Sequence, residues 1–135
     1  MINNLFNFEN TYTKLPDCFF YNQPIKKVKN PEIIIFNELL SKELNINISS
    51  ENKKNLASIF SGNANDENIS PFAQAYAGHQ FGHFTNLGDG RALILGEHLT
   101  SKNRRFDIQF KGSGITPFSR QGDGKAALGP MLREY

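Results

Sequence analysis

The chain has 135 residues with 15 basic and 13 acidic side chains, a formal net charge of +2, and is the size of one domain. No basic cluster stands out, so we expect neither a nucleic acid nor a membrane surface as partner. The 12 phenylalanines and 4 tyrosines exclude a disordered chain, and the single cysteine, Cys18, excludes an internal disulfide.

The first residues lack the basic and apolar run of a signal peptide, and no stretch reaches the roughly 18 apolar residues of a membrane span. We therefore expect a soluble protein, and the single cysteine, which suits a reducing compartment, makes the cytoplasm the expected location. Residues 1–69 hold 14 of the 16 asparagines, whereas residues 78–129 hold 10 of the 11 glycines. This change near Ser70 predicts a helical N-terminal extension over 1–69 and a different, glycine-rich part over 70–135.

In the first part, Asn30 as cap and Pro31 as first helical residue predict a helix over 31–44. A second helix is predicted over 51–60, with Gly62 as its C-terminal cap. The polar residues 62–70 predict an exposed connection between the two parts.

In the second part, strands are predicted over 92–96 and 106–111, with polar residues between them, as in an antiparallel hairpin. The alternation in the second strand places Phe106, Ile108 and Phe110 on a packed face and Asp107, Gln109 and Lys111 on a polar face. A last helix is predicted to begin near Pro130. The fold class is therefore α+β.

Three glycine clusters, at 88–90, 112–114 and 122–124, flank these strands. Closely spaced glycines let backbone N–H groups converge on an anion such as phosphate, and Arg91 and Lys111 would add charge to such a site. The alternative is that the glycines form ordinary turns and that Lys111 is a solvated lysine at the end of a strand. The clusters match neither a phosphate-binding P-loop, because Ala126 follows Lys125, nor a dinucleotide fingerprint, because no strand precedes Gly122.

His79 and His83 are four residues apart and would share one face of a helix, a spacing found in two-histidine zinc sites. Gln80 stands where the zinc-protease pattern has a glutamate. We therefore favour a structural role for this pair and predict no metal site.

Four segments together resemble the selenoprotein O family, also called YdiU: FAQAYAGHQFG (72–82), LGDGRA (87–92), FKGSG (110–114) and residues 122–135. The resemblance implies a protein-kinase-like fold that binds ATP in a reversed orientation. It also implies transfer of AMP from ATP to Ser, Thr or Tyr hydroxyls of proteins, assisted by Mg²⁺ or Mn²⁺.

By matching motif, the resemblance implies nucleotide-binding roles for Gly88, Gly90, Arg91, Lys111, Asp123 and Gly124. It also pairs Lys111 with Glu134, since a lysine on nucleotide phosphates is oriented by a helix glutamate in kinase-like sites. Lys125 and Phe118 stand where the family leads us to expect arginine and tyrosine.

The family's catalytic aspartate and metal ligands lie beyond Tyr135, so we expect no catalytic and no metal-binding residue among these 135. The resemblance thus predicts an incomplete kinase-like N-lobe, formed by the hairpin and the preceding helices, that is inactive alone. Its partners would be protein substrates and the C-terminal part of the protein. The alternatives are a non-catalytic ATP-binding fragment and an unstable remnant of an interrupted gene.

Overall fold

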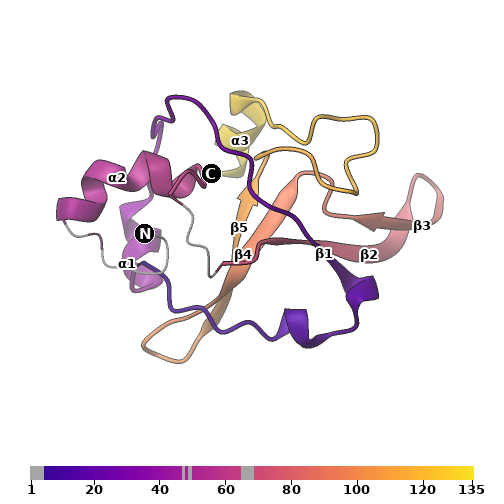
Figure 1. Ribbon diagram of the computed structural model, residues 1–135, viewed down its shortest axis with the longest axis horizontal. Coiled ribbons are helices and arrows are strands. Elements are labelled where there is room, and N and C mark those ends of the chain that lie inside the picture. Colours follow the sequence, from indigo (N-terminus) through magenta and orange to yellow (C-terminus); the bar gives the residue numbers. More distant parts are fainter. Residues whose placement is uncertain (1–4, 47, 49, 65–68) are drawn as a thin grey trace.

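The computed structural model describes residues 5–46, 48, 50–64 and 69–135, and side chains are described outside 50–54. It shows short helices beside an antiparallel sheet, which confirms the α+β class (Figure 1). The strands are β1 (Phe20–Asn22), β2 (Phe72–Gln80), β3 (His83–Gly88), β4 (Ala92–Leu99) and β5 (Arg105–Lys111). Their order is β1-β2-β4-β5, and β3 pairs with β2 alone.

The β4–β5 hairpin confirms the two predicted strands, although β4 runs three residues further than expected. Its register pairs Ala92 with Lys111 and Leu99 with Arg105, with a bulge between Ile94 and Gly96. Along β5, half-buried and exposed residues alternate as the sequence predicts. Lys111 therefore ends the polar face of the strand.

The β2–β3 hairpin was not predicted, and the expectation that His79 and His83 share a helix face is wrong. His79 lies on β2 and His83 on β3, joined by a two-residue turn in which Phe81 and Gly82 have φ values of 59° and 79°. Two positive φ angles are typical of the turn that best fits the twist of a hairpin. The hairpin extends beyond the rest of the sheet (Figure 1).

Helix α2 (Ser50–Phe60) agrees with the predicted second helix, but α1 (Glu38–Glu43) is much shorter than the predicted 31–44. The cap is Asn37, whose side chain accepts a hydrogen bond from Leu40 N, rather than Asn30. The β-branched residues 33–35 lose side-chain freedom in a helix, which disfavours an earlier start. Helix α3 (Leu128–Glu134) begins two residues before Pro130.

The hydrophobic core draws on both predicted parts of the chain. Its buried cluster consists of Leu5, Phe6, Ile59, Ile69 and Leu95. Ile69 belongs to the predicted connection 62–70, of which 65–68 lie outside the described residues, so this end of the connection is buried rather than exposed.

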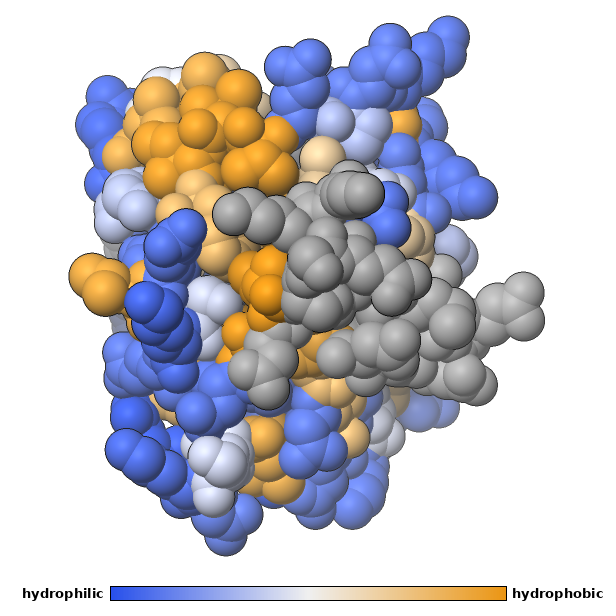
Figure 2. All heavy atoms as spheres, turned by 90° about the vertical axis from the view of Figure 1, so that its left-hand side faces the viewer, coloured by the Kyte–Doolittle hydropathy of each residue, from blue (hydrophilic) through white to orange (hydrophobic). Residues whose placement is uncertain are grey.

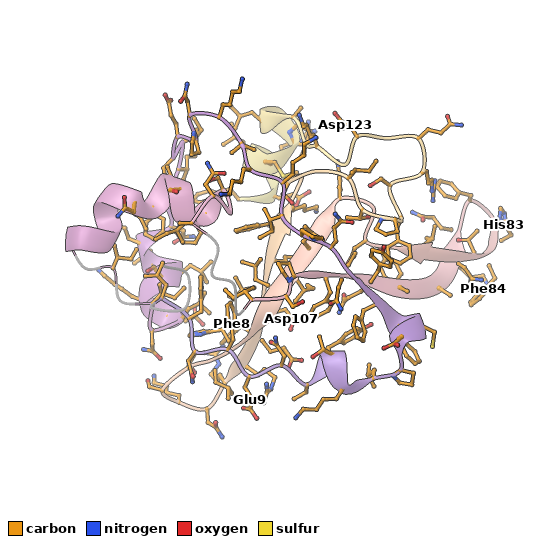
Figure 3. The ribbon with its side chains drawn as sticks, viewed as in Figure 1. Phe8, Glu9, His83, Phe84, Asp107 and Asp123 are labelled. Carbon is orange, nitrogen blue, oxygen red and sulfur yellow. The ribbon has the colours of Figure 1, made fainter. Side chains whose placement is uncertain are left out.

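The N-terminal segment runs beside the last residues of β4, beyond Ile94, which pairs with the first residue of β2. Glu9 N donates to the carbonyl of Glu97, and Leu99 N donates to that of Asn7. Figure 3 shows Phe8 and Glu9 near this end of the β4–β5 hairpin. The buried His98 imidazole accepts from Asn7 N at 3.0 Å and reaches the Leu44 carbonyl at 2.7 Å, so it joins this segment to the end of α1.

Apolar side chains also reach the surface on the side of the molecule that carries the helices (Figure 2). A groove of about 310 Å³ there is lined by Ile33, Ile35, Leu40 and Phe60 among others. In the part of the chain that the structure describes, no helix is both long and apolar enough to cross a membrane.

Candidate functional site

A cavity of about 680 Å³ opens between the β2–β3 hairpin, the turn 88–91, the end of β5 and the loop 118–125. Its lining includes all six residues to which the resemblance assigns the nucleotide: Gly88, Gly90, Arg91, Lys111, Asp123 and Gly124. Figure 3 shows Asp123 on the loop before α3. The fold thus gathers, at one place, residues that are up to 36 positions apart in the sequence.

The cavity lining is cationic. Arg91, Lys111, Arg120 and Lys125 face two acidic residues, Asp89 and Asp123, so positive charges exceed negative ones by two. Burial raises the pKa of Asp89, although the hydrogen bond that its carboxylate accepts from Gln74 N opposes the rise. A site with this balance suits an anionic ligand such as a polyphosphate.

Lys111 at the end of β5 forms an ion pair with Glu134 on α3, with 2.6 Å between Nζ and Oε2. The two side chains are 37% and 47% exposed. A pair this exposed contributes about 1 kcal/mol or less to stability. Its main consequence is geometric, because Glu134 holds the lysine ammonium at the edge of the cavity.

The loop between β5 and α3 is fixed onto the turn 88–91 by short hydrogen bonds. Thr116 Oγ1 donates to the carbonyl of Asp89 and Ser119 Oγ donates to that of Gly90, each at 2.5 Å. Gly112 N donates to the Arg91 carbonyl at 2.6 Å. Two glycine clusters therefore meet through side-chain and backbone contacts.

This contact explains why the cavity glycines are glycines. A Cβ at Gly88 would overlap the Phe118 ring, and one at Gly90 would lie 2.9 Å from the Phe118 carbonyl oxygen. Gly124 has φ of 69°, and its Cβ would overlap the Gly114 carbonyl. The positive φ of Gly124 is one reason for a glycine, and at Gly88 and Gly90 the reason is the packing of one loop on another.

Several lining residues were missed from the sequence. They are Tyr76, Gln80 and Leu87 on the β2–β3 hairpin, Asp89 in the turn, Gln109 on β5, and Ser119 and Arg120 on the loop. Gln109 shares the polar face of β5 with Lys111, a signal that was visible. Tyr76, Gln80 and Leu87 lie in segments that carry the family resemblance, but their strands were not predicted, so their position at the cavity could not be inferred.

The residues that the structure describes bring no three His, Cys, Asp or Glu side chains together as a metal site. His79 contacts the ring of Phe84 edge-on, with 5.3 Å between ring centroids.

Comparisons with known proteins agree with the motifs. The family model described as protein adenylyltransferase SelO matches residues 3–135. Proteins named protein nucleotidyltransferase YdiU from Pelagibacter ubique, Clostridium perfringens and Nitrosococcus oceani are 59%, 60% and 56% identical over 129, 130 and 129 residues. The alignments cover 96% of this chain but 27%, 26% and 26% of those proteins, so the chain spans about a quarter of their length. The chain belongs to the protein adenylyltransferase SelO family.

Proposed function

We propose that this chain forms the nucleotide-binding part of a protein adenylyltransferase, which transfers AMP from ATP to Ser, Thr or Tyr hydroxyls of proteins. The observation that carries the proposal is the cationic cavity, which is lined by all six residues that the family resemblance assigns to the nucleotide. Membership of a family whose relatives are named nucleotidyltransferases supports it.

The proposal includes a kinase-like small lobe, built from the sheet and α3. Its support is the ion pair between Lys111, at the end of a strand, and Glu134, on the next helix. In kinase-like sites this pairing positions a lysine on the nucleotide phosphates. Lys111 would act in the same way here.

In the proposed reaction the acceptor hydroxyl oxygen attacks the α-phosphorus of ATP and forms a new P–O bond. The bond between the α-phosphorus and the bridging oxygen breaks, pyrophosphate leaves, and the hydroxyl proton passes to a general base. Lys111 and Arg91 would hold the triphosphate and stabilise the negative charge that develops on it. The proposal assigns no general base to the described residues.

Mg²⁺ or Mn²⁺ is expected to accompany ATP, and the described residues bring together no three His, Cys, Asp or Glu side chains that could hold either ion. The proposal therefore assigns no metal-binding role to the described residues. We also propose that the 135-residue chain alone binds ATP without transferring AMP, because the proposal assigns no general base to the described residues.

Titration calorimetry with ATP tests the proposal on the wild-type chain and the Lys111→Ala variant. We expect Lys111→Ala to weaken binding at least about tenfold, which corresponds to the loss of one charge-assisted contact of about 1.4 kcal/mol. Unchanged affinity in this variant would contradict the proposed site. Incubation of the wild-type chain with α-labelled ATP, Mg²⁺ and acceptor proteins should leave those proteins unlabelled.

Lys102→Ala is the matched control, because Lys102 is an exposed lysine in the turn between β4 and β5, away from the cavity. It removes the same charge from the chain and should leave ATP affinity unchanged. Circular dichroism should show that both variants fold, since the ion pair of Lys111 is half exposed.

A further inference from the structure

The β2–β3 hairpin supplies the cavity with an apolar pair that phosphate binding does not explain. Tyr76 and Leu87 both line the cavity and lie directly opposite each other in the antiparallel register. Directly opposed residues on one face have Cβ atoms about 5 Å apart. The tyrosine is 50% exposed, so a large part of its surface is available to a ligand.

We propose that Tyr76 and Leu87 form the platform on which the nucleobase stacks. This inference rests on the proposed function. A nucleoside triphosphate has an aromatic base at one end and an anionic chain at the other, and the cavity offers an apolar pair on the hairpin and cations on other elements. Its cations come from the turn 88–91, β5 and the loop 118–125, whereas the hairpin contributes no charged lining residue.

The alternation of the strand separates this platform from the other aromatic residues of the hairpin. Tyr76 and Gln80 lie on one face of β2 and line the cavity. His79 and its partner Phe84 lie on the other face and are not part of the lining. Figure 3 shows Phe84 near the outer end of the hairpin. Phe84 is 62% exposed, which makes it a matched control.

The hairpin is also fixed relative to the phosphate side of the cavity. The guanidinium of Arg120, on the loop, lies 5.1 Å from the centroid of the Phe81 ring at the hairpin turn. Both residues have positive φ angles, 59° for Phe81 and 55° for Arg120, which are unfavourable for side chains of this size. The contact between them joins the hairpin turn to the loop that carries Arg120.

Calorimetry with ATP and with inorganic triphosphate tests the platform. Tyr76→Ala should weaken ATP binding about tenfold, the size expected for loss of one base–aromatic stack, and leave triphosphate binding unchanged. Tyr76→Phe should keep ATP affinity, since it keeps the ring. Phe84→Ala should bind both ligands like the wild type.

A fluorescence experiment tests the platform without comparing the affinities of two variants. The chain contains no tryptophan, so Tyr76→Trp introduces a single fluorescent indole at the platform. ATP should quench its emission by stacking, and inorganic triphosphate should not.

Three outcomes separate the inference from the function on which it rests. If Tyr76→Ala binds ATP like the wild type, or loses ATP and triphosphate equally, the platform is wrong. If that variant does not fold, absence of ATP quenching in Tyr76→Trp overturns the platform instead. If the wild-type chain binds neither ligand, the proposed function fails and the platform fails with it.

Discussion

Glu97 shows how a single carboxylate ties the N-terminal segment to the sheet. The residue is 7% exposed and accepts hydrogen bonds from the backbone and hydroxyl of Thr11, the latter at 2.8 Å. The Arg105 guanidinium lies 3.2 Å away and also contacts Glu9. Burial raises the pKa of Glu97, but the Thr11 hydrogen bonds and the charge of Arg105 outweigh it and lower the pKa below its ordinary value of 4.5.

The lowered pKa makes stability depend on pH in a defined direction. Because the folded pKa lies below the unfolded one, the contribution is complete above the unfolded pKa and is lost as pH falls through the folded pKa. We expect Glu97→Gln to lower the free energy of unfolding at pH 7 by about 1–3 kcal/mol, since charged hydrogen bonds are lost. Urea unfolding at several pH values should show a flatter profile for the variant below about pH 5.

Glu43→Gln is the control for this effect. Glu43 forms an ion pair with Arg104 in which both side chains are 54% exposed, so its loss should change stability by less than about 1 kcal/mol. Equal losses in the two variants would show that the buried network adds nothing beyond a surface pair.

At the scale of elements, the loop between β5 and α3 depends on Gly124. We expect Gly124→Ala to destabilise the chain by about 2 kcal/mol, because the methyl group would overlap the Gly114 carbonyl at a φ of 69°. ATP affinity should fall as well, since the displaced loop carries Arg120 and Lys125. Thermal melting and calorimetry measure the two effects.

Gly129→Ala gives the matched comparison. Gly129 lies in α3, its φ is not positive, and an added Cβ would meet nothing within 4 Å. Alanine favours a helix over glycine by up to about 1 kcal/mol, so this variant should be as stable as the wild type or more so. Wild-type ATP binding in Gly124→Ala would mean that the loop does not shape the site.

Local patterns in the sequence were sufficient for β4, β5 and α2, because their signals lie within about ten neighbouring residues. Alternation along β5 placed Lys111 on the polar face, and the structure agrees. The β2–β3 hairpin escaped because its residues 75–78 include two alanines and a glycine, which have weak strand preference. The run of isoleucines at 33–35 was misjudged as helix, although Asn37 caps the true start.

The candidate site was also predictable only in part. The glycines and charged residues were recognisable as motifs, but their meeting at one cavity depends on how the loop 113–125 folds back onto the turn 88–91. The contacts of Thr116, Phe118 and Ser119 that produce this fold connect positions nearly thirty residues apart. No local pattern encodes such a contact.

At the scale of the whole molecule, the sheet that carries the site packs against residues far upstream in the sequence. Leu5, Phe6 and Ile59 pack with Leu95 of β4 in one core, and His98 reaches the Leu44 carbonyl. A Cβ at Gly96 would lie 2.6 Å from the Phe8 ring, so the N-terminal segment also packs directly on β4. The predicted boundary near residue 70 can therefore be tested by cutting the chain there.

We expect residues 70–135 alone not to fold, although they contain every residue that lines the cavity. Each of Leu5, Phe6 and Ile59 contributes about 1.5–3 kcal/mol by burial, and together they approach the 5–15 kcal/mol that holds a typical domain together. Circular dichroism should show no cooperative thermal transition for 70–135, in contrast to the whole chain. A cooperative transition would instead establish 70–135 as an independent domain, with the N-terminal residues as an accessory layer on a site that is already formed.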